Sequence, residues 1–409
     1  MNLADIALEK LLSVEEQLLE LESVEYPHET SKDALKVIVK SVRDRKEALS
    51  NQPPEFLHAG WAEEVTLLVV DVLEYLGLIV NSASVRNSFE VHAPLYSMAK
   101  KLIGPDVRLI LTFEWNYIPF TYPQNIALLP EFIVIGLPAS EAGNALIIPS
   151  AGHELGHSIW RNGDYDHLFG SALQDHIKNG LRGEYLEKLK EFHPDVHDLD
   201  DYNNRYVWES AYEWSLGQTQ ELFCDVVGLF IFGESYLRAF EYLLAPQLTT
   251  TRSEAYPKLR TRANLLGKAA SSVGLGDFHN FLKNFQDEST NNTGWILILE
   301  NLADNAAIAV FDEMVLAAVE YCRGRDFSPP IQDDWNDVCA AFKDRTPLFG
   351  AAGLPHVINA AWQLYLDADF VPTNICGGKR RLAVLNELVL KTIEMLEISE
   401  LLHESAAPC

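Results

Sequence analysis

The sequence predicts a predominantly helical α+β protein with one small sheet. Apolar residues recur at a spacing of three to four over most of the chain, as expected of amphipathic helices. Two short β-branched runs, 107–113 and 131–136, interrupt this pattern and are typical of strands. The 409 residues are 48% hydrophobic, enough to bury a full core, and contain no internal repeat or low-complexity segment.

The N-terminal region, residues 1–104, is expected to contain helices only. Within the second helix, Leu35, Ile38, Val39 and Val42 lie on one face, which predicts burial of that face. Asn51 to Pro54 should separate the first pair of helices from the second. The helices are expected at 3–23, 31–49, about 61–80 and 85–103.

The middle region, residues 105–275, begins with the two strands. The second strand is either an edge that could pair with an extended peptide or an ordinary core strand. A helix should follow from Asn144 to Arg161, starting or kinking near Pro149 with Ser150 as a cap. Polar residues at about 162–205 indicate an inserted lobe, and a long helix is expected over 206–232. The C-terminal region, 276–409, should again be helical.

The charge and cysteine content exclude several classes of protein. A net charge of −27 argues against nucleic acid and against anionic membrane surfaces, both of which need a basic patch. No run of eighteen apolar residues is present, so membrane insertion is not expected. The acidic first residues differ from a secretory signal, and the five cysteines form no CxxC pair. We therefore expect a soluble, cytoplasmic protein with reduced thiols.

The most informative segment is His153-Glu-Leu-Gly-His157. Histidines at i and i+4 on one helical face can both bind one zinc ion, and Glu154 is placed to take a proton from a water molecule. The alternative is an amphipathic helix that merely carries two histidines. The flanking residues Ile148 and Trp160 are apolar and favour burial of the motif.

A catalytic zinc site needs a third protein ligand. The metzincin spacing would require histidine at position 163, which is Gly163, and the short thermolysin spacing would place glutamate near Ile177. Glu221 and Asp225 instead lie at i and i+4 within an apolar helix, where unpaired carboxylates are costly. Glu221 is the predicted third ligand, and Asp225 the predicted acceptor for the outer N–H of a zinc-binding histidine. The alternative is an acid pair on a solvated helix edge.

His153-Glu-x-x-His157 followed by Glu221-x-x-x-Asp225 resembles the gluzincin metallopeptidases. The long spacing is similar to that of the CAAX prenyl protease and HtpX families, although the chain lacks their membrane helices. The resemblance implies a zincin-like core over 105–275, with the small sheet beside the HExxH helix. It also implies that Arg262 matches a family arginine, and that Tyr256 stands where the families have histidine. Tyr256 could donate a hydrogen bond to an oxyanion.

The predicted function is therefore hydrolysis of peptide bonds by a metallopeptidase with one catalytic Zn²⁺, Glu154 as general base and a peptide or protein as substrate. Two alternatives remain open. One is a catalytically restrained or inactive zincin-fold protein with an interaction or regulatory role. The other is a metallohydrolase that acts on a non-peptide amide. A regulatory partner or a homo-oligomer would be one means of restraining a cytoplasmic peptidase.

Overall fold

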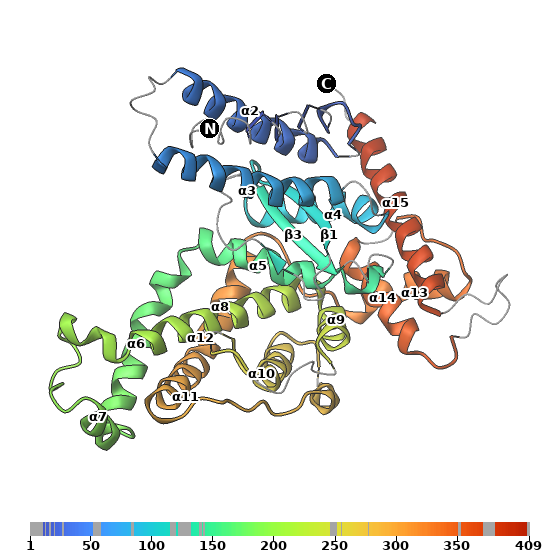
Figure 1. Ribbon diagram of the computed structural model, residues 1–409. Helices are drawn as coiled ribbons and strands as arrows, with labels where there is room; N and C mark the ends of the chain where they lie inside the picture. The colour runs from blue at the N-terminus through green and yellow to red at the C-terminus, as the bar shows by residue number, and fades with distance from the viewer. Residues whose placement is uncertain are drawn as a thin grey trace. The chain divides into compact units, whose positions relative to one another are not determined.

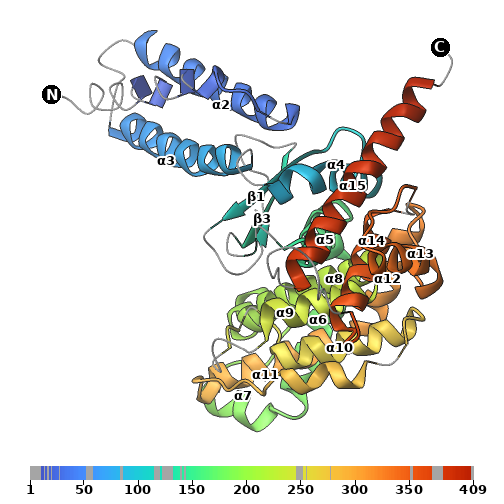
Figure 2. The ribbon, with the colours of Figure 1, turned by 90° about the vertical axis from the view of Figure 1, so that its right-hand side faces the viewer.

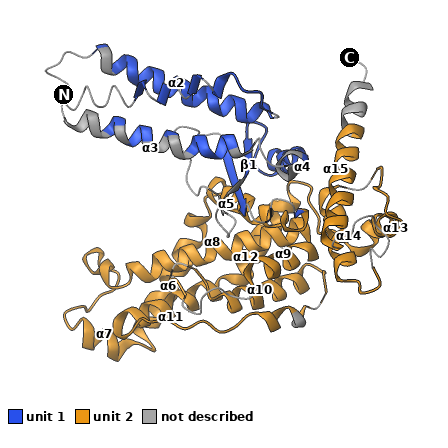
Figure 3. Ribbon diagram, turned by 45° about the vertical axis from the view of Figure 1, so that its right-hand side comes forward, with its two compact units in different colours: residues 1–144 blue, residues 145–409 orange. Residues whose placement is uncertain are grey.

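The computed structural model describes residues 11–406 with several gaps. The residues outside the description are 13, 16, 17, 20, 27, 52–58, 83–85, 115–119, 122–131, 139–140, 142–143, 246–251, 255, 277, 351–352 and 371–380. The described chain is mostly helical with one small sheet, which confirms the predicted fold class at that level. It divides into two compact units, residues 1–144 and 145–409 (Figure 3).

In the described part of unit 1, helices α2, α3 and α4 accompany the sheet. Helices α2 and α3 lie side by side, and α2, α3 and α4 all contact β1 (Figure 1). Its hydrophobic core joins the apolar faces of α2 and α3 to Ile110 of β1 and to Phe132 and Val134 of β3. The elements are α2 (Glu29–Asn51), α3 (Ala59–Ser82), α4 (Arg86–Leu102), β1 (Arg108–Glu114), β2 (Phe120–Thr121) and β3 (Phe132–Pro138).

The sheet has the strand order β1-β3-β2. Strand β3 pairs in parallel with β1 along its whole length, from Arg108 opposite Phe132 to Glu114 opposite Pro138. It also pairs antiparallel with the short β2. All seven residues of β3 are buried. The second predicted strand is therefore the central core strand of the described sheet, and the alternative of a free peptide-binding edge does not hold.

Unit 2 is built around α8, which contacts α5, α6, α9, α10, α11, α12 and α14. Helices α13, α14 and α15 lie together in the C-terminal part of this unit (Figure 2). The elements are η3 (Ala145–Ile147), α5 (Ser150–Asn162), α6 (Tyr165–Arg182), α7 (Leu186–Phe192), η4 (Tyr202–Val207), α8 (Glu209–Phe232), α9 (Glu234–Leu244), α10 (Leu259–Ser272), η5 (His279–Asn284), α11 (Gly294–Ala309), α12 (Phe311–Arg323), η6 (Gln332–Trp335), α13 (Asn336–Lys343), α14 (Leu354–Leu366) and α15 (Arg381–Ala406).

These two units differ from the three regions expected at 1–104, 105–275 and 276–409. The strands group with the N-terminal helices because β1 packs on α2, α3 and α4. The C-terminal helices group with the HExxH helix because α11, α12 and α14 pack on α8. The sheet and the HExxH helix belong to different units, so their adjacency, and with it a zincin-like core, stays a prediction.

The sequence predicted a polar inserted lobe at about 162–205 and a helix start near Pro149 and Ser150. The segment 162–205 contains α6, α7 and the start of η4, and α6 packs on α8 and α11. Ser150 is the first residue of α5, and its hydroxyl donates to the carbonyl of Ile147 (2.8 Å) rather than capping the helix. Pro149 holds the position before the helix, where its fixed φ suits a helix start. No described helix is both long and apolar enough to cross a membrane.

Candidate metal centre

The HExxH segment lies on α5, pressed closely against α8. A Cβ at Gly156 would lie 2.7 Å from the Cα of Cys224, and a Cβ at Gly152 would lie 3.0 Å from the Cα of Gly228. Real Cβ atoms do not come as close to backbone as 2.7 Å, so position 156 requires glycine; at position 152 a Cβ would also lie 2.9 Å from Cδ2 of Phe232. The two glycines, four residues apart, let the backbones of α5 and α8 meet. His153 and His157, each one residue further on, are thereby brought to the carboxylates of α8.

The three predicted metal ligands lie together. The Nε2 atom of His153 is 3.4 Å from one carboxylate oxygen of Glu221, and the Nε2 atom of His157 is 3.6 Å from the other. Zinc bonds of about 2.0–2.1 Å in a tetrahedral site place neighbouring ligand atoms about 3.4 Å apart. Each histidine Nε2 atom therefore lies at about the distance from Glu221 that two ligands of one zinc ion would have.

Asp225 holds His153 from the other side of its ring. The Nδ1 atom of His153 lies 2.9 Å from Oδ1 of Asp225. Because a carboxylate only accepts, Nδ1 carries the proton and the hydrogen bond orients Nε2 toward Glu221. Arg262 donates to both oxygens of Asp225 (2.8 and 2.9 Å), and the hydroxyl of Tyr236 donates to Oδ1 (2.7 Å). The contact expected between Asp225 and a ring N–H is therefore present.

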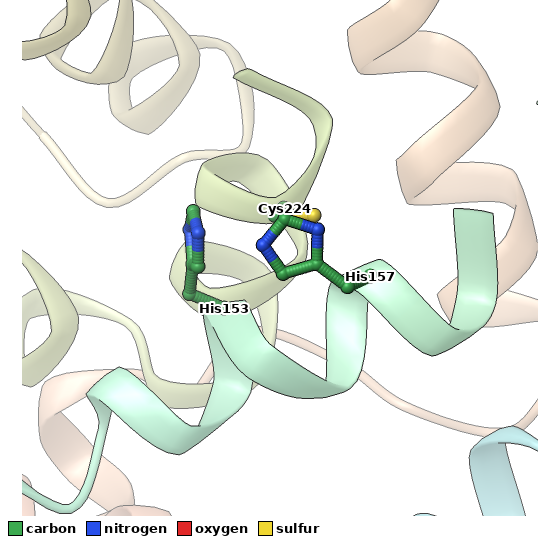
Figure 4. Close-up of side chains that lie close together, drawn as sticks. All are labelled: His153, His157 and Cys224. Carbon is green, nitrogen blue, oxygen red and sulfur yellow. The ribbon is translucent and has the colours of Figure 1, made fainter. Parts of the chain in front are cut away.

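Cys224 also belongs to the cluster. One ligand atom each from His153, His157 and Cys224 lies within 4.8 Å of the others, so these three could hold a metal ion. Figure 4 shows the Cys224 sulfur beside the ring of His157. Cys224 is a free, fully buried cysteine. The Nδ1 atom of His157 is buried and has no hydrogen-bond partner.

The two histidines differ in charge. Burial lowers the pKa of His153, but its contacts with Asp225 and Glu221 outweigh that effect and raise the pKa to about 10. Burial and the charge of His153 lower the pKa of His157 to about 4. Burial opposes ionisation of Asp225, yet the Arg262 guanidinium and His153 hold the pKa of that carboxyl well below its usual range. A metal ion at this site would displace the proton on Nε2 of His153.

Glu154 is a buried carboxylate, only 3% exposed. It forms no hydrogen bond or ion pair with any other described residue. Burial is the main reason that its pKa rises to about 7, with the charge of His153 acting in the opposite direction. A buried carboxyl without a protein partner is unusual. In this position it is free to bond to a water molecule or a substrate.

Tyr256 and Arg262 were both expected at the reacting atoms on the basis of resemblance. Tyr256 is half-exposed, and the charge of Glu221 is the largest cause that raises its phenol pKa, which places it within electrostatic reach of the cluster. Arg262 is buried and engages Asp225, with its guanidinium 3.5 Å from Glu221. Its donors are directed at the two carboxylates of α8.

Sequence reasoning did not identify Tyr236 or the two glycines of the α5–α8 contact. Gly152 and Gly156 carried a recognisable signal, because small residues four apart permit close helix packing. Tyr236 carried none, since it lies on α9 at no motif spacing from Asp225. The comparisons with family models, curated proteins and solved structures each returned no match.

Proposed function

We propose that the chain is a zinc-dependent metallopeptidase. The observation that carries the proposal is Glu154, a buried carboxylate without a hydrogen bond to any described residue, next to a histidine whose Nε2 atom contacts Glu221. A helix that merely carried two histidines would not need an unpaired buried carboxyl between them. A general base with a pKa near neutrality is suited to proton transfer at physiological pH.

His153, His157 and Glu221 would hold the zinc ion, supported by their mutual distances of 3.4 and 3.6 Å. When bound, zinc supplies a Lewis acid that lowers the pKa of a water molecule and polarises the substrate carbonyl. Asp225 orients His153, and Arg262 and Tyr236 in turn fix Asp225. We assign Arg262 a positioning role through Asp225 instead of direct contact with the substrate.

Glu154 would act as the general base and then as the general acid. It takes a proton from the water molecule as the water oxygen attacks the peptide carbonyl. It then passes that proton to the nitrogen as the carbon–nitrogen bond breaks, which yields a carboxylate and an amine. The half-exposed Tyr256 would donate a hydrogen bond to the oxyanion.

A second candidate is a structural metal site formed by His153, His157 and Cys224. It is favoured by the proximity of their ligand atoms. A site formed by these three residues leaves Glu154 without a role, and for this reason we prefer the catalytic site.

The test combines metal analysis with a change at Glu154. We expect near-stoichiometric zinc in the purified protein by mass spectrometry, and cleavage of members of a diverse peptide library. Glu154→Gln should retain zinc and lose at least about a thousandfold in rate. Glu209→Gln, an equal change on the exposed start of α8, is the matched control and should retain both. Zinc-loaded protein that cleaves no peptide, or an active Glu154→Gln, would refute the proposal.

A further inference from the structure

Arg161, in the last turn of α5, follows His157 by one helical turn. Residues four apart on a helix lie on the same face, and a rise of about 1.5 Å per residue separates them by about 6 Å along the axis. The Arg161 side chain folds back along α5, so that its Nε atom donates to the backbone carbonyl of His157 (3.4 Å). Its Nη2 atom donates to the hydroxyl of Ser158 (3.3 Å). The guanidinium is therefore held beside a candidate metal ligand.

The guanidinium of Arg161 has no carboxylate partner among the described residues. Both of its hydrogen bonds go to neutral oxygens, and no described acid forms an ion pair with it. Burial lowers the pKa of Arg161, an effect that a neighbouring carboxylate would oppose. Arg262, by contrast, is paired with both Asp225 and Glu221. In a chain with a net charge of −27, Arg161 thus offers a cation whose counter-charge the described residues do not supply.

The candidate metal centre and Arg161 are both exposed to solvent in part. The side chains of His153, His157 and Glu221 are 11%, 12% and 13% exposed, and Arg161 is also partly exposed. The two features are close enough to interact. Burial is the largest cause of the low pKa of His157, and the charge of Arg161 is one of the smaller causes. A ligand bound at the centre could therefore extend along α5 to the guanidinium.

The separation between the centre and Arg161 suits the last residue of a peptide. A substrate carbonyl bound beside His157 would have the guanidinium within about one helical turn, or about 6 Å. Each residue of an extended chain spans at most about 3.3–3.6 Å, so a carboxylate one residue further on comes within hydrogen-bond reach. Nη1 and one N–H of Nη2 are not used within the described chain. Such a pair of donors can bind both oxygens of a carboxylate, which is stronger than a bond to a neutral carbonyl.

We infer that Arg161 binds the α-carboxylate at the C-terminus of the substrate, so that the peptidase removes single residues from that end. The inference rests on the proposed function, because it names the substrate class of the same site. Water adds to the carbonyl of the last peptide bond and the carbon–nitrogen bond breaks. The shortened peptide keeps the water oxygen in its new carboxylate, and the released amino acid receives the proton from Glu154. Arg161 takes no part in the proton transfer.

Peptide binding to the zinc-loaded Glu154→Gln protein tests the carboxylate contact separately from hydrolysis. The probes are three peptides of one sequence that carry fluorescein at the N-terminus. One ends in a free acid, one in a C-terminal amide, and one in an amide with Glu as its last residue. Fluorescence anisotropy should show the free acid binding about ten- to a hundredfold more tightly than the amide, as expected for a hydrogen-bonded charge pair. The amide that ends in Glu should bind as the plain amide does.

Substitution of Arg161 should remove this preference. Arg161→Gln, added to Glu154→Gln, should bring the free acid and the amide to within about twofold, whereas Arg161→Lys keeps the charge and should retain part of the preference. Arg182→Gln is the matched control, because Arg182 is also an exposed arginine in the last turn of a helix, α6, and it should change nothing. The ratio of acid to amide binding is measured first in Glu154→Gln alone, so the inference can fail even if an Arg161 variant does not fold.

The outcomes separate this inference from the proposed function. Equal binding of the free acid and the amide, a preference that survives Arg161→Gln, tight binding of the amide that ends in Glu, or no binding of any probe would overturn the role of Arg161. Cleavage of internal bonds by the wild-type protein, whatever the C-terminal group, would also overturn it while supporting the peptidase. If the wild-type protein cleaves nothing but the preference is present and depends on Arg161, the carboxylate site stands and the peptidase proposal falls.

Discussion

Unit 2 contains two buried ionic clusters that differ in how completely they are paired. In the first, Arg252 binds Glu300 (3.2 Å) and Asp304 (2.6 Å), and Glu300 also accepts from Thr290 and Asn292. The charged groups of this cluster are each matched by a counter-charge or a donor. We call it the Arg252 cluster.

The second is the candidate metal centre, in which pairing is incomplete. Asp225 accepts from His153, Arg262 and Tyr236 and is as fully bonded as Asp304. Nδ1 of His157, however, is buried without a hydrogen-bond partner within the described chain. Glu154, only 3% exposed, forms no hydrogen bond with another described residue. Burial of polar groups is costly unless they are bonded, so a cluster that only stabilises the fold should resemble the Arg252 cluster. Unsatisfied polar groups beside satisfied ones indicate a binding site whose hydrogen-bond or metal partner is not part of the protein chain.

Removal of Glu221 should have the largest effect on the metal centre. Zinc binding of about 10–16 kcal/mol is shared among three or four ligands, so Glu221→Ala should weaken zinc binding by about a thousandfold or more. Cys224→Ser should change it by less than about threefold if the thiol is not a ligand. Competition with a zinc chelator measures both affinities.

The reverse result would identify the other ligand set. If Cys224→Ser releases zinc while Glu221→Ala retains it, the centre is a His/His/Cys site and the catalytic interpretation fails. Circular dichroism of each variant, compared with the wild-type spectrum, shows whether loss of zinc follows from loss of the fold.

Substitution of Arg252 should lower the stability of the protein and leave its affinity for zinc unchanged. Arg252→Ala leaves Glu300 and Asp304 buried without their cation, which should lower the free energy of unfolding by about 3–5 kcal/mol. Arg238→Ala, which removes an i,i+4 pair with Glu234 on the surface of α9, should cost less than about 0.5 kcal/mol. Urea unfolding followed by circular dichroism provides the comparison.

Zinc affinity separates this result from a general loss of structure. The folded Arg252→Ala protein should bind zinc as the wild type does, because no predicted ligand contacts Arg252. A folded variant with a much lower zinc affinity would show that the two clusters are coupled through the loop that carries Tyr256.

The sequence predicted the helical class, both long strands and the helices that carry the candidate metal ligands. It succeeded because apolar spacing reports which helix face is buried, and because two histidines four apart share that face by geometry alone. His153, His157 and Glu221 could thus be named before their distances were known. The sequence could not show whether β3 lies at an edge or at the centre of the sheet. Its central position depends on pairing with β2, which is only two residues long.

What the sequence could not provide depends on contacts between distant elements. The division at residue 144 arises from packing of β1 on α2, α3 and α4, which no local pattern encodes. The same holds for Tyr236, which reaches Asp225 only because α9 packs on α8. The role of Arg262 was carried over from a motif, whereas its bidentate contact with Asp225 is a property of the folded chain.

The finest test concerns Asp225, the member of the metal centre that most resembles the Arg252 cluster. Asp225→Asn keeps the shape of the side chain but removes the charge that orients His153 and binds Arg262. Loss of such an outer partner typically weakens metal binding by about 10–100-fold, less than the loss of a direct ligand. Chelator competition should therefore place this variant between Cys224→Ser and Glu221→Ala. An affinity equal to that of the wild type would mean that Asp225 serves the fold alone, as Asp304 does, and that incomplete pairing at Glu154 and His157 is the only functional feature of the centre.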